Sequence, residues 1–360
     1  MAGLRVAGCK TKKTFYVVKV SMVFLAMIYL FNPNICFTFG LQSSKMSINN
    51  VKQLRDFDSF FELVNYFNSE EKCVEYLATL RWNGVIECPY CANDTCYVLN
   101  GANKRFKCAK CRKQFSVRVG TIFEDSKIEL RKWFFAIYLF TAHKKGISSH
   151  QLAKDIKITQ KSAWFLLQRI REAFTHDEAT DLSGEVEVDE TYIGGKEINK
   201  HKSKREKGVK RVNNKIPVLG IVERGGKVYA VPVKDAKTRT TYPIISDKVA
   251  PGTKIYTDEL PAYKFLRLDY AHDYVRHSAD EYVRGDVHTQ NIDNFWSLLK
   301  RGIFGIYHHV SPEHLHRYVN EFAYRYNNRK MTDGSRFDVY LANATKKITY
   351  PELINKAKKD

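Results

Sequence analysis

The sequence lacks a clean apolar run long enough to cross a bilayer. An apolar stretch covers residues 15–39, but a lysine, two asparagines and a proline interrupt it. Its clean part, Val20 to Phe31, falls short of the roughly 20 apolar residues that a membrane-spanning helix needs and has the length of a signal-peptide core. From Met46 onward the chain reads as an amphipathic helix. We therefore expect translation to start there and residues 1–45 to be an untranslated apolar extension; a membrane anchor is the alternative.

Acidic residues are also few relative to basic ones. The 360-residue chain carries 59 Lys and Arg against 39 Asp and Glu, a formal net charge of +20. Apolar residues make up 44% of the chain, which excludes a disordered protein. A folded protein with this excess of positive charge usually meets a polyanion, and nucleic acid is the first candidate. Surface solvation by lysine is the alternative, but it requires no such bias in sign.

Cysteine is scarce, and four of the eight cysteines form two Cys-x-x-Cys pairs. This usage excludes a disulfide scaffold and indicates metal binding in a reducing compartment. Cys88 and Cys91 form the first pair and Cys108 and Cys111 the second, with sixteen residues between the pairs. Four thiolates at this spacing predict one tetrahedral zinc ion (Zn²⁺) in a ribbon over residues 85–120. Because protein ligands fill all four positions, the zinc would be structural and would supply folding energy.

The predicted ribbon is basic, and its cations alternate with aromatic residues. Lys107 and Arg112 are the candidates for contacts with DNA phosphates. A ribbon that docks another protein is the alternative. Cys96 lies outside the spacing pattern, and we interpret it as a spare thiol.

Helices are predicted on both sides of the ribbon, over residues 46–84 and 127–176. The second region holds an apolar helix, a short helix with Ser148 or Ser149 as N-cap, a tight turn, and an amphipathic helix with Thr159 as N-cap. This layout is typical of a helix-turn-helix, although many helical hairpins share it without touching DNA. The side chains of the last helix that we expect to be exposed and to contact DNA are Gln160, Lys161, Gln168, Arg169 and Arg171.

Beyond residue 184 the sequence alternates polar and apolar residues, which predicts strands. Asp189 lies on the first strand, Asp258 ends the fourth, and Asp293 lies on a helix that begins near Gln290. Acids at the ends of adjacent strands and on a later helix can converge on a pair of divalent metal ions that orients a water or a 3′-hydroxyl. Carboxylate oxygens suit Mg²⁺ or Mn²⁺. The alternative is that each acid is a solvated turn residue.

Three ordered motifs in this region resemble those of one family. They are Val188-Asp-Glu-Thr-Tyr-Ile-Gly-Gly-Lys196, Tyr256-Thr-Asp258 and His288-Thr-Gln-Asn-Ile-Asp293-Asn-Phe-Trp-Ser-Leu-Leu-Lys-Arg-Gly302. With the ribbon and Val119-Gly-Thr-Ile-Phe123, they resemble the bacterial insertion-sequence transposases related to the Merlin transposons, in the DDE transposase and integrase superfamily. The resemblance covers roughly residues 57–330.

The resemblance implies an RNase H-like catalytic domain over residues 184–330, with Asp189 and Asp258 as the first two metal-binding acids. The third acid of the family is usually Glu, and Asp293 takes its position here. Asp is one methylene shorter than Glu, so its reach to a metal changes by about a bond length. Lys300 lies seven residues after Asp293, on the same helix face, where related enzymes often place a cation that contacts DNA near the cut.

Further residues near these acids are expected to contribute. Glu190, Glu259, Asn291 and Asn294 are neighbours that could assist. Additional DNA-binding candidates are Arg301 and, within the basic block over residues 196–215, Lys204, Arg205, Lys210 and Arg211. We interpret the block as a loop that orders on DNA. Residues 331–360 are expected to be a C-terminal tail.

These observations predict a multidomain α/β protein with a zinc ribbon, a helix-turn-helix-like segment and an RNase H-like mixed-sheet domain. We expect a transposase that hydrolyses a strand at each transposon end and transfers the exposed 3′-hydroxyl to target DNA. Because two ends must be cut together, a homo-oligomer on DNA is expected. The expected location is the cytoplasm, at the nucleoid, with no stable membrane partner. The alternative is a DNA-binding protein that keeps the ribbon and the helix-turn-helix but has lost catalysis.

Overall fold

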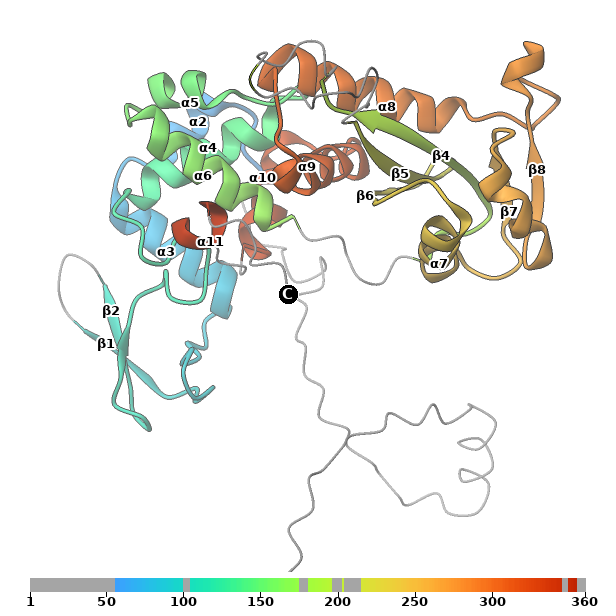
Figure 1. Cartoon of the computed structure of the whole chain (residues 1–360). Helices are drawn as coiled ribbons and strands as arrows, with labels where there is room; N and C mark the ends of the chain where they lie inside the picture. The colour runs from blue at the N-terminus through green and yellow to red at the C-terminus, as the bar shows by residue number, and fades with distance from the viewer. Residues whose placement is uncertain are drawn as a thin grey trace, which may run out of the picture. The chain divides into compact units, whose positions relative to one another are not determined.

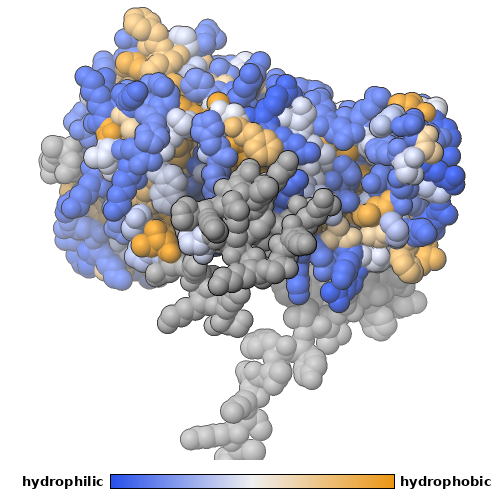
Figure 2. Space-filling view, turned by 45° about the horizontal axis from the view of Figure 1, so that its top comes forward, coloured by the Kyte–Doolittle hydropathy of each residue, from blue (hydrophilic) through white to orange (hydrophobic). Residues whose placement is uncertain are grey.

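The structure is a computed structural model that describes residues 56–99, 104–174, 181–195, 203, 215–344 and 349–354. All of these residues lie in one compact unit, Ser47–Asp360. The predicted extension over residues 1–45 lies outside the described residues. Within the described ranges, no helix combines the length and the apolar character that a membrane span requires. Figure 2 shows a face on which hydrophilic residues predominate and hydrophobic ones gather in small groups.

Most of a helical core precedes the five-stranded sheet in the chain, and one helix of it follows the sheet. The helical core is formed by α2 (Phe60–Tyr66), α3 (Glu70–Trp82), α4 (Leu130–Ala142), α5 (Ser149–Asp155), α6 (Gln160–Glu172) and α10 (Asp333–Ala342). The predicted N-caps are confirmed for α5 and α6, because the hydroxyls of Ser148 and Thr159 accept hydrogen bonds from Gln151 N and Ser162 N. These two helices have the predicted layout of a short helix, a turn and a second helix.

The segment that was expected to be a C-terminal tail instead contributes α10 to this core. Phe337 is fully buried, and the hydroxyl of Tyr340 donates to the carbonyl oxygen of Ile170 at 3.1 Å. Asp338 accepts a hydrogen bond from the hydroxyl of Tyr76 on α3 at 2.5 Å. The apolar spacing of α10, at intervals of three and four residues, is a helical signal that the sequence contains.

The ribbon is a small antiparallel sheet of β1 (Cys96–Leu99), β2 (Arg105–Cys108) and β3 (Gln114–Phe115). Its aromatic residues pack on α3, since the rings of Phe106 and Phe115 lie 5.1 and 6.1 Å from that of Trp82. The ribbon therefore shares the core of the helices.

The second part of the fold is a five-stranded mixed sheet in the order β6-β5-β4-β7-β8 (Figure 1). Its strands are β4 (Glu185–Ile193), β5 (Ile216–Glu223), β6 (Val228–Pro232), β7 (Lys254–Thr257) and β8 (Ala271–Tyr274). The first three strands pair antiparallel, whereas β4, β7 and β8 run parallel. This is the RNase H-like arrangement that the resemblance implied, and β5 and β6 form an antiparallel hairpin within it.

Helices cover both faces of this sheet. On one face lie α8 (Gln290–Gly302) and α9 (Leu315–Asn327), and on the other lie α7 (Thr238–Lys248) and the 3-10 helix η4 (Pro261–Leu268) (Figure 1). Close packing of α8 explains a glycine in β5, because a Cβ atom on Gly220 would lie 2.6 Å from the ring of Trp296. The remaining described elements are η5 (His277–Ala279), the π-helix η6 (Ile303–Tyr307), η7 (Pro312–His314) and α11 (Tyr350–Ile354).

Buried charges join α6 to α9. Arg171 Nε donates to Glu321 Oε2 at 2.7 Å, and both side chains are almost fully buried. Arg325 Nη2 and the hydroxyl of Tyr307 donate to Glu321 Oε1 at 2.7 and 2.6 Å. Removing one member would leave a buried charge without its partner, which typically costs about 3–5 kcal/mol.

Candidate functional site

The four thiols of the two Cys-x-x-Cys pairs meet at one point in the ribbon. The Sγ atoms of Cys88 and Cys111 lie 3.7 Å apart, those of Cys91 and Cys108 lie 3.6 Å apart, and all four lie within 4.8 Å of one another. A tetrahedral zinc ion with Zn–S bonds of about 2.3 Å requires sulfurs about 3.8 Å apart. The predicted set of four is confirmed as a group, and Cys96 is not part of it.

The two Cys-x-x-Cys turns have the same backbone arrangement. The amide of each first cysteine donates to the carbonyl five residues further on, at 2.9 and 3.1 Å. The residue after each second cysteine, Ala92 or Arg112, has a positive φ, of 53° and 59°. Burial opposes ionisation of Cys108, but the amides of Cys111 and Lys110 and the neighbouring thiols outweigh it and lower its pKa to about 6. This favours the thiolate form that binds metal.

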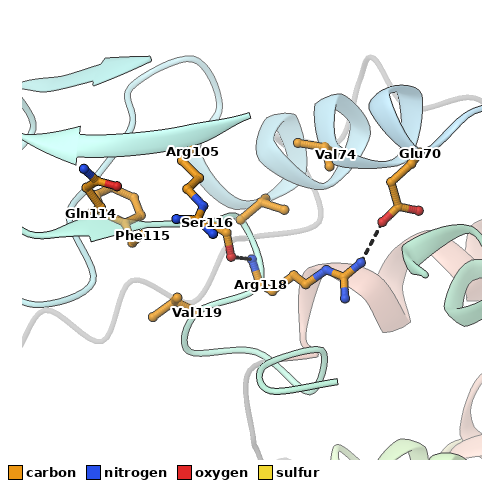
Figure 3. A pocket seen from close by; sticks show the side chains of 9 residues that line it. Glu70, Val74, Arg105, Gln114, Phe115, Ser116, Arg118 and Val119 are labelled. Atoms are coloured by element: carbon orange, nitrogen blue, oxygen red, sulfur yellow. Dashed lines mark hydrogen bonds and ion pairs between the residues drawn. The ribbon is translucent and has the colours of Figure 1, made fainter. Parts of the chain in front are cut away.

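A cavity of about 430 Å³ lies between the ribbon and α3 (Figure 3). Arg105 lines it from β2, and Arg118 crosses below it to pair with Glu70 Oε1 at 2.6 Å. The same carboxylate accepts hydrogen bonds from Leu130 N and Arg131 N at 3.0 and 3.2 Å. Glu70 therefore caps the first turn of α4, which has no side-chain N-cap of its own. Arg118 is held in this structural contact.

The cations of α6 do not all face outward. Arg169 is 3% exposed, its Nη2 donates to the carbonyl oxygen of Glu124 at 2.8 Å, and its guanidinium lies over the rings of Trp133 and Phe165. Gln168 and Arg171 are buried as well. The prediction of Gln168, Arg169 and Arg171 as exposed DNA contacts is therefore wrong, because that side of α6 is buried.

Other predicted DNA-binding residues remain accessible. Lys161, Arg112 and Arg301 are exposed, and Lys107 and Lys300 are half-buried. Lys204, Arg205, Lys210 and Arg211 lie outside the described residues.

The first two predicted acids lie side by side on the sheet. β4 and β7 are parallel neighbours with Glu187 opposite Tyr256, and continuing this register by two residues brings Asp189 opposite Asp258. Such strands lie about 4.8 Å apart. Burial, followed by the charges of Glu190 and Asp258, raises the pKa of Asp189 to about 7. Burial also raises the pKa of Asp258.

Glu190 is a third carboxylate in this cluster, as its neighbour position suggested. Burial raises its pKa, and the charge of Asp258 adds to this effect. The hydroxyl of Tyr263 on η4 donates to Glu190 Oε2 at 2.7 Å. Like charges thus add to burial in raising the pKa of Asp189 and of Glu190, and a cation would relieve this concentration of negative charge.

Asp293 lies on α8, the helix that packs on this sheet. It is exposed, and Thr289 Oγ1 donates to its Oδ2 at 3.4 Å. Asp293, Trp296 and Lys300 follow one another at three and four residues, so they form one stripe on the helix. The indole Nε1 of Trp296 donates to Asp189 Oδ2 at 2.9 Å. This hydrogen bond attaches α8 to the first acid.

The N-terminus of α8 is held by Glu187, whose role the sequence did not reveal. Its side chain is fully buried on β4, two residues before Asp189. Its Oε2 accepts hydrogen bonds from Asn291 N and Ile292 N at 2.7 and 3.0 Å, and its Oε1 accepts from Asn291 Nδ2 and Arg224 Nε at 2.8 and 2.9 Å. No side chain of α8 caps its own first turn. Glu187 therefore ties the helix that carries Asp293 to the strand that carries Asp189.

The three predicted acids do not form a closed ligand set. Among the described residues, the four cysteines are the only group of three or more His, Cys, Asp or Glu side chains whose ligand atoms all lie within 4.8 Å of one another. The structure thus brings Asp189 and Asp258 together and places Asp293 on the adjacent helix, outside such a group.

Two protein-family models match this chain. An ISXO2-like transposase domain matches residues 181–327, and a transposase zinc-ribbon domain matches residues 68–114. The two segments contain the carboxylates and the cysteines described above, and they define a DDE-type transposase architecture.

Curated relatives support the same family. A protein in the transposable element ISH50 of Halobacterium salinarum is 30% identical over 275 residues, which cover 73% of this chain and 92% of the relative. A transposase-like protein of Haemophilus influenzae is 31% identical over 106 residues, or 29% of this chain and 85% of the relative. This chain belongs to the IS1595 family of transposases, with the ISXO2-like transposase domain over residues 181–327. The expected relation to Merlin transposons and the bacterial origin stay predictions.

Solved structures of the Mos1 transposase show a weaker likeness. The Mos1 strand transfer complex has 13% identity and a TM-score of 0.24, and the alignment covers 60% of this chain and 79% of that chain. The Mos1 paired end complex with Mn has 12% identity and a TM-score of 0.19, over 52% of this chain and 74% of that chain. At these TM-scores the likeness carries no conclusion about this chain.

Proposed function

We propose that this transposase binds transposon ends, cleaves DNA strands and transfers them to target DNA, with Asp189, Asp258 and Asp293 as the metal-binding acids. The observation that carries the proposal is the pairing of Asp189 and Asp258 on adjacent parallel strands, beside the stripe of Asp293 and Lys300 on α8. The charge at this point supports a cation there, because burial, followed by the like charges of Glu190 and Asp258, raises the pKa of Asp189 to about 7.

The donor set fits Mg²⁺ or Mn²⁺. Carboxylate oxygens are the ligands that these hard cations prefer. Asp189 and Asp258 would hold the metal, with Asp293 completing the site from α8. When bound, a divalent pair supplies orientation of the attacking water or 3′-hydroxyl and stabilisation of the leaving oxygen of a phosphodiester.

Residues around the acids would position them and the DNA. The indole of Trp296 orients the carboxylate of Asp189. Glu187 fixes the start of α8 and hence the position of Asp293. Lys300, one turn beyond Trp296, would contact a phosphate of the strand at the acids.

The ribbon would bind one structural Zn²⁺ through its four cysteines. With the protein filling every position, this ion supplies folding energy and leaves no open site for a substrate. Lys107 and Arg112 on the ribbon, Lys161 on α6 and Arg301 on α8 are proposed to contact DNA phosphates. Lys204, Arg205, Lys210 and Arg211 are proposed to bind DNA as well. Two transposon ends would be held by a homo-oligomer.

The test is a strand-cleavage and strand-transfer assay on DNA that carries the element's own ends, with Mg²⁺ or Mn²⁺. Cleavage that requires both the metal and Asp258 supports the proposal. The second candidate is a DNA-binding protein without catalysis, which the exposed position of Asp293 outside a closed ligand group favours. Binding of the ends without any cutting would support that candidate.

A further inference from the structure

The 3-10 helix η4 presents one basic face, because side chains three residues apart align on such a helix. Tyr263 and Leu266 form the face that is buried against the sheet. Lys264 and Arg267 form the next face, and both are exposed. At eight residues, η4 is long for a 3-10 helix, whose runs rarely exceed about four residues.

This face lines a cavity of about 500 Å³ beside the second acid. Asp258, which follows β7, forms part of its wall, and Arg276, which follows β8, forms another part. Since β7 and β8 are parallel, the cavity lies at their carboxyl ends, where sheets of this kind commonly bind ligands. A strand held at the acids would therefore pass the mouth of this cavity.

An aromatic side chain organises the two arginines. The guanidinium of Arg267 lies 5.2 Å from the centre of the Tyr274 ring, and Arg276 Nη2 donates to the hydroxyl of Tyr274 at 3.3 Å. His272, on the same face of β8, is bound through Nε2 to Thr257 Oγ1 at 2.9 Å, while its Nδ1 is buried without a hydrogen-bond partner. Among the described residues that line the cavity, two side-chain atoms, His272 Nδ1 and Glu259 Oε2, are thus buried without a hydrogen-bond partner.

The positive charges in this cavity are not neutralised by ion pairs. In the part of the chain that the structure describes, Lys264, Arg267 and Arg276 form no ion pair within 4.0 Å. Two carboxylates line the cavity, but Glu259 is bound by Ser278 N at 3.0 Å and Asp258 belongs to the acid cluster. Three cations against these two acids leave an excess of positive charge, which favours an anion. Two guanidinium groups provide the paired donors that phosphate oxygens accept.

We infer that this cavity binds a backbone phosphate of the DNA strand that is held at the acids. The phosphate is the neighbour of the one at the acids, and Arg267 and Arg276 bind it, with Lys264 at the rim. The inference rests on the proposed function for the identity of the strand as DNA. Binding of this phosphate would fix the path of the strand past Asp258. The contact would be to the backbone and would carry no base specificity.

The test measures binding of a short DNA end to the full chain at several salt concentrations, without added divalent metal. Each phosphate contact that is lost should reduce the slope of log affinity against log salt by about 0.9. Because both arginines hold the same phosphate, the double variant Arg267→Ala/Arg276→Ala should lower that slope by about 0.9 and weaken binding at low salt. Arg239→Ala is the matched control, because Arg239 is exposed on α7 and pairs with Asp235 at 3.5 Å outside the cavity. It should leave the slope unchanged.

Each outcome decides the inference. An unchanged slope and affinity in the double variant overturn it, as does an equal loss in Arg239→Ala. Inorganic phosphate should bind far more weakly than the DNA end, and equal affinity for both would identify a site for free phosphate instead. If the wild type binds DNA but does not cut it once Mg²⁺ or Mn²⁺ is added, and the double variant still loses slope, the cavity is confirmed and the proposed catalysis fails. If the wild type binds no DNA, both fail.

Discussion

Trp296 on α8 donates its indole hydrogen to Oδ2 of Asp189 on β4, at 2.9 Å. The acceptor is the acid of the cluster whose pKa burial raises to about 7, so the hydrogen bond restrains a carboxylate that like charges would otherwise push away. The two residues lie 107 positions apart in the chain. The contact joins the first predicted metal ligand to the helix of the third.

Trp296→Phe should keep the aromatic packing and remove this hydrogen bond. Loss of a partner that orients a metal ligand typically lowers activity or metal affinity by about 10–100-fold, and we expect a loss of that size in DNA cleavage. The cost in stability should be only about 1 kcal/mol. Trp133→Phe is the matched control, because Trp133 Nε1 donates to Ser126 Oγ at 3.0 Å in the helical core. A loss of cleavage in the control equal to that in Trp296→Phe would contradict the assigned role.

Glu187→Gln should loosen the start of α8. An amide can accept through only one of its two ends, so it cannot replace both oxygens that bind Asn291, Ile292 and Arg224. We expect the Kd for Mn²⁺ to rise by about 10–100-fold, measured by titration of the zinc-loaded protein without DNA. Asn291→Ala removes only one of these hydrogen bonds and should have a smaller effect in the same direction.

Glu70→Gln serves as the control for Glu187→Gln, because Glu70 caps α4 in the same manner far from the acids in sequence. It should lower the melting temperature and leave Mn²⁺ affinity unchanged. If both variants change Mn²⁺ affinity alike, Glu187 has no specific link to the acids.

Zinc removal should unfold the ribbon, because its strands are short and its folding depends on the metal. Metal analysis of the purified protein should find one zinc per chain. Cys108→Ser should lose the zinc and expose Trp82, detected by a shift in tryptophan fluorescence. Cys96→Ser should retain one zinc, since Cys96 stays outside the cluster. Loss of zinc from Cys96→Ser would contradict the ligand set.

Asp338 should make folding stability depend on pH. Burial raises its pKa from 3.8 to about 7, so the folded protein keeps a proton that the unfolded chain has already released. Its contribution to stability is therefore greatest below pH 4 and declines as pH rises to about 7, by at most about 4 kcal/mol. Asp338→Asn does not ionise, so its stability relative to the wild type should increase over this window and level off above it. Urea unfolding at a series of pH values measures the difference, and a constant difference would contradict the account.

Local patterns in the sequence predicted much of the molecule. The Cys-x-x-Cys spacing gave the metal cluster, and the alternation around Asp189 gave the central strand with its acid. The caps at Ser148 and Thr159 gave two helix starts, because their partners lie three residues away. In each case the residues that form the pattern are near one another in the sequence.

Contacts between distant segments could not be predicted in this way. Arg169 reads as an exposed cation, but the carbonyl of Glu124 and two aromatic rings accommodate it in the core. Arg171 is buried because Glu321, 150 positions away, neutralises it. Glu187 reads as one acid among several on a strand, and only the folded position of α8 reveals it as a cap. The helix α10 is different, since its apolar residues do have helical spacing in the sequence, and the expectation of a C-terminal tail over residues 331–360 is wrong there.

The most direct test of the account compares DNA cleavage by the wild type with cleavage by Asp189→Asn, Asp258→Asn and Asp293→Asn, on the element's own ends with Mg²⁺ or Mn²⁺. Asp338→Asn is the control, since it changes a buried carboxylate to an amide outside the acid cluster. We predict metal-dependent cutting by the wild type and the control, and a loss of about a thousandfold or more in the three variants, with DNA binding retained. Cleavage that persists in Asp258→Asn, or end binding by the wild type without cleavage, would contradict the account.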